Sequence, residues 1–250
     1  MLIAVGRDHD RIVAALKVIG ADKDVSAVAV VGVFDSEEHA VAARDAGVRA
    51  AGGDIDHVVT VQGFADIGPA VTATPLADLQ ATLANGLYNN VLAAKVFVPL
   101  LKKRDGATFT LVSGGLAHAA YHESQWRATV KNAAINAFTL GLAKETEKDA
   151  VRVNNICIHF SVGPVEGGES TLDAARRVHT FMARTDDPRG GTHAERKNQL
   201  GMPAERTTFS LGQAFVGLSK DASARGRVIC LAGWADVDAL ASKSGLKARV

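Results

Sequence analysis

The sequence predicts an α/β protein in which a mostly parallel sheet is covered by helices on both faces. The first observation is that short apolar runs alternate along the chain with longer stretches of helical spacing. The second is that several runs, such as the β-branched stretch 25–33, are almost entirely apolar, as in strands buried on both faces. The third is that 47% of the 250 residues are apolar, enough for one large core in a single domain spanning 1–250.

The N-terminal quarter alternates strands and helices. The first helix has apolar residues at helical spacing and ends at Gly20. The second helix is rich in alanine and carries Glu37 and Glu38 in its first turn, where the helix dipole favours negative charge. In order, we predict a strand at 2–5, a helix at 10–19, a strand at 25–33, a helix at 36–51 and a strand at 57–61.

The rest of the chain continues this rhythm with longer helices. The stretch 75–101 fits one long helix or two. The stretch 124–148 fits another, and Ser124 is its expected N-cap, because a serine hydroxyl accepts a hydrogen bond from the first helical turn. We also predict strands at 107–112, 151–160 and 226–231, and helices at 171–183 and 210–219.

Charge and composition narrow the classes of partner. The formal net charge is +1 without blocks of like charge, which argues against nucleic acid or an anionic membrane as the main partner. The apolar runs are too short to span a bilayer and no leader pattern is seen, so we expect a cytoplasmic protein.

Cys157 and Cys230 both lie in apolar runs, so we expect two small core residues. Neither a disulfide framework nor zinc-ligand spacing is present, and we expect no metal.

Several segments carry a specific pattern when taken together. Asn85 stands fourteen residues before Pro99 in LQATLANGLYNNVLAAKVFVPLL, and Ser113 follows the strand-like run FTLV. Lys131 lies in the helical run RATVKNAAINAFTLGLAKE, and Val162 follows the strand VRVNNICIHF. With the closing strand RGRVICLAG, this set resembles the short-chain dehydrogenase/reductase family over roughly residues 1–235. The resemblance implies a Rossmann-like domain and an oxidoreductase.

The chain also departs from the family pattern. Arg127 stands where the family has the tyrosine of its YxxxK motif. The glycine-rich turn is absent, since the first strand continues as GRDHDR with Gly6 as its single glycine. The family's Asn-Asn-Ala-Gly segment is replaced by residues 60–63, Thr-Val-Gln-Gly, which end at Gly63. Gly32 occupies the place of the aspartate that faces adenine.

Two alignments of the N-terminus with the family are open. In the first, residues 2–5 match the family's second strand, so that its first strand and glycine-rich loop are missing and a gap of roughly 10 Å opens in mid-sheet. Arg7 then matches an arginine that meets the 2′-phosphate of NADP, or is a solvated loop cation. In the second, residues 2–5 form the central strand and Asp35 binds a ribose hydroxyl, as acidic residues do in dinucleotide sites.

The resemblance implies roles for particular residues. In the family, tyrosine transfers the proton, lysine lowers the pKa of the tyrosine and holds the ribose, serine binds the substrate oxygen, and asparagine supports a water relay. Arginine cannot replace tyrosine as an acid at neutral pH, because it keeps its proton, but it can bind a carboxylate. We predict Asn85, Ser113, Arg127 and Lys131 as catalytic residues, and Gly6, Arg7, Gly63, Lys131 and Val162 as cofactor contacts.

Other readings of these residues stay open. Arg127 alternatively faces solvent on its helix, and Asn85 alternatively satisfies the backbone in a helix bend. Tyr121 is a substitute acid or loop packing. The histidines His118, His122 and His159 are proton carriers or play no catalytic part.

Three functions compete. The first is an NADP-dependent reductase or dehydrogenase of a small carbonyl or imine in specialised metabolism. The second is a non-redox isomerase or cyclase that holds an anionic or polar substrate with Arg127 and Lys131. The third is an inactive binding or scaffold subunit. The resemblance also implies a homo-oligomer formed through the long helices 75–101 and 124–148.

Overall fold

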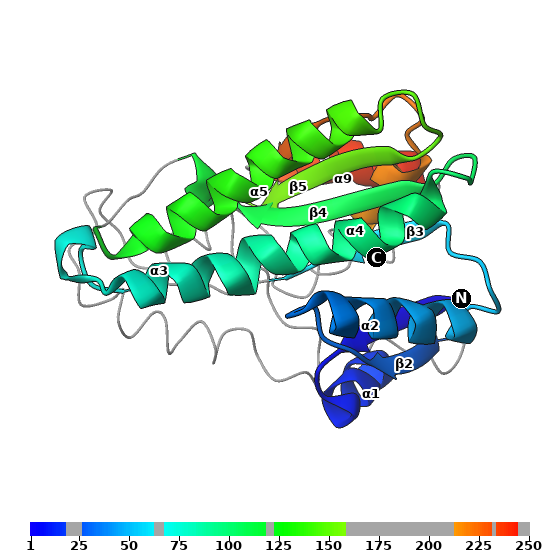
Figure 1. The fold of residues 1–250 in the computed structure, drawn as a ribbon. Coiled ribbons are helices and arrows are strands. Elements are labelled where there is room, and N and C mark those ends of the chain that lie inside the picture. Colours follow the sequence, from blue (N-terminus) through cyan, green and yellow to red (C-terminus); the bar gives the residue numbers. More distant parts are fainter. Residues whose placement is uncertain (19–26, 63–67, 119–122, 159–212, 232–233, 245–250) are drawn as a thin grey trace.

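The structure is a computed structural model that describes residues 1–18, 27–62, 68–118, 123–158, 213–231 and 234–244. Its strands form two parallel sheets (Figure 1). The smaller sheet pairs β1 (Leu2–Gly6) with β2 (Ala27–Val31). The larger sheet has the order β3-β4-β5-β6, with β3 (His57–Thr60), β4 (Thr108–Gly114), β5 (Arg152–Ile158) and β6 (Val228–Leu231).

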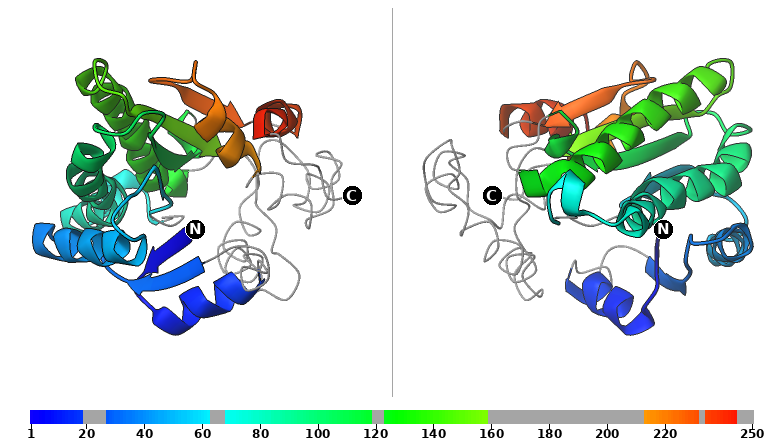
Figure 2. Two further views of the ribbon diagram at one scale, coloured as in Figure 1. Left: turned by 90° about the vertical axis from the view of Figure 1, so that its right-hand side faces the viewer. Right: turned by 60° about the vertical axis from the view of Figure 1, so that its left-hand side comes forward.

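Helices cover both faces of the larger sheet. α4 and α5 run side by side across one face, and α9 lies beyond the other face (Figure 1, Figure 2). The α-helices are α1 (His9–Val18), α2 (Glu37–Ala50), α3 (Leu76–Leu83), α4 (Asn89–Leu101), α5 (Trp126–Glu145), α9 (Trp234–Ala241) and a helical segment at 213–220. The π-helix is η2 (Ala84–Tyr88), and the 3-10 turns are η1 (Val71–Ala73), η3 (Gly115–Ala117), η4 (Glu123–Gln125) and η5 (Ser242–Ser244).

Two apolar clusters sandwich the larger sheet. The cluster on the α4 and α5 side includes Phe109 and Ile135, and the cluster on the α9 side includes Ile156 and Leu218, all of them fully buried. Burial on both faces explains why β4 and β5 read as nearly continuous apolar runs. The predicted α/β fold with helices on both faces is therefore confirmed.

The division into two sheets decides between the two N-terminal alignments. In the second alignment β1 would be the central strand and would pair with β3. In the structure β1 pairs with β2 alone, and no described residue forms a strand between β1 and β3. The first alignment agrees with this order, and the second is wrong.

Helix packing joins the smaller sheet to the larger one. Ala40 of α2 is buried in the core cluster of α4, and the rings of Phe34 and Phe97 lie 6.2 Å apart. The ammonium group of Lys95 lies 2.6 Å from the carboxylate of Glu37. These contacts hold α2 alongside α4, although none of the described residues forms a strand between β1 and β3.

The structure decides between the open readings of one helix and corrects another. The stretch 75–101 forms two helices, α3 and α4, joined by the π-helical turn η2. Asn90 donates a 2.6 Å hydrogen bond to the carbonyl of Gly86 there, so Asn90 rather than Asn85 satisfies the backbone at the bend. α5 begins at Trp126 after the 3-10 turn η4, so Ser124 is not its N-cap.

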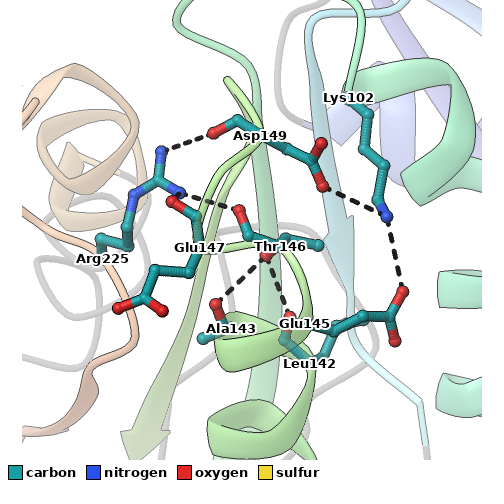
Figure 3. A network of polar contacts seen from close by, with 8 residues as sticks. All are labelled: Lys102, Leu142, Ala143, Glu145, Thr146, Glu147, Asp149 and Arg225. Atoms are coloured by element: carbon teal, nitrogen blue, oxygen red, sulfur yellow. Dashed lines mark hydrogen bonds and ion pairs between the residues drawn. The ribbon is translucent and has the colours of Figure 1, made fainter.

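Arg225 joins several chain segments at the end of the molecule opposite the carboxyl end of β4 (Figure 3). The guanidinium of Arg225 donates to the carbonyls of Thr146, Glu147 and Asp149 at 3.0–3.1 Å. Lys102 forms ion pairs with Glu145 and Asp149. The turn between α5 and β5 is thereby tied to the chain preceding β6 and to the end of α4.

The remaining predictions have mixed outcomes. α9 was not predicted, and the predicted helix at 171–183 lies outside the described residues. Cys157 is buried as expected, but Cys230 is exposed rather than a core residue. Among the helices that the structure describes, none is long and apolar enough to cross a membrane.

Candidate active site at the carboxyl ends of the strands

Ser113 lies near the carboxyl end of β4, where parallel sheets commonly collect binding groups. It is buried, and its hydroxyl lies 2.7 Å from Asn136 Oδ1 and 3.0 Å from Asn155 Oδ1. A hydroxyl has one hydrogen, so it donates to one of these two oxygens at a time. To bind a substrate oxygen, Ser113 has to redirect that hydrogen away from the amide groups.

Two asparagines fix α5 against this strand end. Asn132 accepts a 2.8 Å hydrogen bond from the backbone N–H of Gly114. Asn136 is one turn further along the helix and contacts both Ser113 and Asn155. Since residues four apart share a helix face, α5 presents these amides to the end of β4 together.

Lys131 lies on the same helix and is 5% exposed. A Cβ added to Gly86 would lie 2.5 Å from Lys131 Cγ and closer still to Cδ, so the lysine stem packs directly on the glycine. Gly86 belongs to the π-helical turn η2, which also contains the exposed Asn85. The structure thus brings two predicted site residues, Asn85 and Lys131, to adjoining elements. A π-helical turn in a long helix often marks a functional site.

Arg127 is buried at the start of α5, which excludes the alternative that it faces solvent. Its Nη1 lies 3.3 Å from Asp78 Oδ2 of α3. A Cβ added to Gly68 would lie 2.7 Å from Arg127 Nε, so the guanidinium also packs on that backbone. The carboxylate of Asp78 offsets the charge that Arg127 would otherwise present to an anionic ligand.

The cofactor implied by the fold, a nicotinamide dinucleotide, fits part of this arrangement. The hydroxyl of Thr60 is buried at the end of β3 without a hydrogen-bond partner among the described residues, which leaves a polar atom for a ligand. Lys131 and Asn85 are further polar groups that a nicotinamide riboside would meet here. These three residues come from β3, α5 and η2.

The residues after β1 and β2, which would meet the diphosphate and adenosine of such a cofactor, fit it less well. A Cβ at Gly6 would meet the side chain of Ile12 at 3.3 Å, so protein already occupies that space. A Cβ at Gly32 would lie 2.6 Å from Ala43 Cβ, and close packing of β2 on α2 leaves no room for an aspartate there. Arg7 is exposed after β1; the pKa of Asp35 is lowered chiefly by its hydrogen bond with His39, and the charge of Arg7 adds to this. The predicted contacts Gly63 and Val162 lie outside the described residues.

His118 is the one proton-carrier candidate among the described residues, since Tyr121, His122 and His159 lie outside them. Its Nε2 lies 3.4 Å from Cys230 Sγ and 3.5 Å from Asn136 Nδ2. The buried thiol of Cys157 is close by, and burial raises its pKa to about 11.

The sequence reading missed the amide network around Ser113. A signal was available, because Asn154 and Asn155 interrupt a strand that is otherwise apolar. Buried amides need partners, and both side chains are fully buried. Asn132 and Asn136, four apart on the helix of Lys131, were the matching candidates.

Comparisons with known proteins agree with the fold and with the family resemblance. The profile of a family described as enoyl-(acyl carrier protein) reductase matches residues 3–186. No curated protein matches the chain.

Similar solved structures include the apo form of a short-chain oxidoreductase from Pseudomonas aeruginosa PAO1 that contains an atypical catalytic centre. It is 18% identical, with a TM-score of 0.72 over 92% of this chain and 86% of that chain. An NADPH-bound structure with the same description is 19% identical, with a TM-score of 0.69 over 91% and 84%. A short-chain type dehydrogenase/reductase from Mycobacterium ulcerans is 19% identical, with a TM-score of 0.68 over 94% and 80%.

Proposed function

The chain belongs to the short-chain dehydrogenase/reductase family, and from this premise we propose that it is an NADP(H)-dependent oxidoreductase of a small carbonyl or imine compound. The observation that carries the proposal is the burial of Lys131 against the π-helical turn that contains Asn85. Lys131 stands where the family has the lysine that holds the ribose, and its ammonium group would donate hydrogen bonds to ribose hydroxyls. NADPH, when bound, supplies the hydride.

The chain's own residues would position the substrate. Ser113 would turn its hydroxyl hydrogen from the amides of Asn136 and Asn155 to the substrate's polar atom. The two amides hold the serine side chain in place before that exchange. This arrangement orients the substrate without moving the backbone of β4.

Proton transfer separates this site from the tyrosine-based sites of the family. Arginine side chains are not proton donors in proteins, and Arg127 is ion-paired with Asp78. It would therefore orient or polarise a substrate rather than transfer a proton. An iminium ion accepts a hydride and becomes a neutral amine without a proton from the protein, so we favour an imine that binds as its iminium ion over a carbonyl substrate.

Preference for NADP over NAD would rest on Arg7. Its cationic side chain follows β1, at the end of the smaller sheet, where it would meet a 2′-phosphate. The similar Pseudomonas aeruginosa oxidoreductase has an NADPH-bound structure, which supports the choice. Asp35 would repel a phosphate, but its carboxylate lies 2.6 Å from His39 Nδ1, and that contact reduces the repulsion.

A cofactor titration tests the proposal. We expect the full chain to bind NADPH, as measured by calorimetry, and Lys131→Met to weaken binding at least about 10-fold, the effect of losing roughly 1.4 kcal/mol. Methionine keeps the apolar stem against Gly86. Lys144→Met is the matched control, because Lys144 lies on the same helix but is exposed. Absence of binding by both NADPH and NADH would refute the proposal.

The second candidate is a non-redox isomerase or cyclase on the same scaffold. It is favoured by the absence, in the described residues, of a glycine-rich cradle for the diphosphate. Substrate turnover that continues after the cofactor is stripped would establish it, whereas turnover that stops would exclude it.

We also propose that the chain forms a homo-oligomer through α4 and α5. Both helices carry large apolar side chains that are at least 36% exposed: Val91 and Leu100 on α4, and Val130 and Leu140 on α5. Covering them in a subunit interface would remove apolar surface from water. A monomer measured by light scattering would contradict the proposed homo-oligomer. It would also weaken the third candidate function, an inactive scaffold subunit.

A further inference from the structure

A row of three side chains crosses the larger sheet next to the candidate active site. Ser113 of β4 is in register with Cys157 of β5, which is in register with Cys230 of β6. Partners in register in a parallel sheet project from the same face, because side chains alternate between faces along each strand. Both thiols therefore stand on the face that carries Ser113.

His118 completes a cluster with the two cysteines. It follows the 3-10 turn η3, and its Nε2 lies 3.4 Å from Cys230 Sγ. The potential ligand atoms of His118, Cys157 and Cys230 all lie within 4.8 Å of one another. Two sulfur atoms and one imidazole nitrogen are the donor set that Zn²⁺ prefers.

We propose that His118, Cys157 and Cys230 bind a zinc ion through two thiolates and one imidazole. Zinc–sulfur bonds of about 2.3 Å and zinc–nitrogen bonds of about 2.0–2.1 Å give tetrahedral edges of roughly 3.8 Å between sulfurs and 3.6 Å between sulfur and nitrogen. The 3.4 Å between His118 Nε2 and Cys230 Sγ is close to such an edge, and no pair of ligand atoms is more than 4.8 Å apart, so side-chain rotations would complete the site. Three protein ligands leave a fourth position for water or another small ligand.

The surroundings favour a bound cation. Ser113 is in register with Cys157, so a polar hydroxyl borders the buried thiol. Cys230 and His118 are exposed, so an ion can reach the cluster from solvent. A disulfide between the two cysteines would make no use of His118, whereas zinc uses all three groups.

Cobalt is the probe, because tetrahedral Co²⁺ with thiolate ligands absorbs visible light and zinc does not. The full chain, reduced and freed of metal by a chelator, is titrated with CoCl₂. We expect one equivalent of Co²⁺ per chain, with a thiolate-to-cobalt charge-transfer band and intense visible bands. Zn²⁺ should then abolish both.

Variants of the exposed ligands test the assignment without emptying the core. Cys230→Ser and His118→Gln should each weaken Co²⁺ binding at least about 100-fold, because each removes one of three protein ligands. His39→Gln is the matched control, since His39 is an exposed histidine on α2, and it should bind like the unmodified chain. Circular dichroism checks that the variants fold.

Three outcomes would overturn the proposal. These are two titratable thiols with no metal bound, a disulfide between the cysteines in the protein as purified, and Co²⁺ binding that His118→Gln leaves unchanged. None of these readouts depends on NADPH, so the zinc site and the proposed function fail independently.

Discussion

Replacing Gly86 by alanine tests whether the lysine stem needs the space that glycine leaves. The new Cβ would lie 2.5 Å from Lys131 Cγ, about 1 Å inside the ordinary carbon–carbon contact distance of about 3.5 Å. Cγ is near the root of the side chain, so the whole stem has to rotate about χ1. Lys131 is buried, and the stem therefore has little room to move.

The magnitude follows from two opposing effects. Overpacking a buried site costs about 1–3 kcal/mol, whereas alanine in a helix is about 1 kcal/mol more favourable than glycine. Gly141 of α5 supplies the matched control, because a Cβ there would meet nothing within 4 Å. Gly141→Ala should therefore gain about 1 kcal/mol, and Gly86→Ala should be about 1–3 kcal/mol less stable than Gly141→Ala.

Guanidinium chloride unfolding followed by circular dichroism measures both free energies. NADPH titration adds a second readout, since a displaced Lys131 should weaken binding at least about 10-fold in Gly86→Ala and leave Gly141→Ala unchanged. If Gly86→Ala is as stable as Gly141→Ala, the contact between Gly86 and Lys131 does not shape the site. The reasoning would then be refuted.

Three further predictions concern groups around the sheet. In urea unfolding, Arg152→Met should lower the free energy of unfolding by at least about 3 kcal/mol, because the buried guanidinium donates to four main-chain carbonyls. The control Arg49→Met removes an exposed arginine and should cost under about 1 kcal/mol. Asp78→Asn should cost about 1–2 kcal/mol by the same assay, and no change would mean that the ion pair does not hold Arg127. Desolvation lowers the pKa of His57 below 6.5, so folding favours its neutral form and the free energy of unfolding should fall as the pH drops below 6.5. His57→Gln should show a smaller fall between pH 7.5 and 5.5, and an equal fall would contradict the assignment.

Local sequence patterns predicted most of the helices and strands but not the π-helical turn between α3 and α4. Apolar periodicity depends on near neighbours, so the strand ending near Ser113 and the helix carrying Lys131 were both predicted. The π-helical turn was not, because it depends on Asn90 reaching the carbonyl of Gly86 and on Lys131 packing from another helix. The burial of Arg127 likewise depends on Asp78, 49 positions away in the chain.

The sequence by itself determined the order of strands and helices, the family resemblance, and the absence of tyrosine and glycine-rich turn from their usual places. The tertiary structure alone decided that β1 does not pair with β3, that Ser113 faces two amides, and that His118 meets Cys230 across 112 positions of chain. The physical reason is strand register. Each strand's own residues determine which side chains share a face, but the neighbour opposite each one is determined only when the sheet assembles.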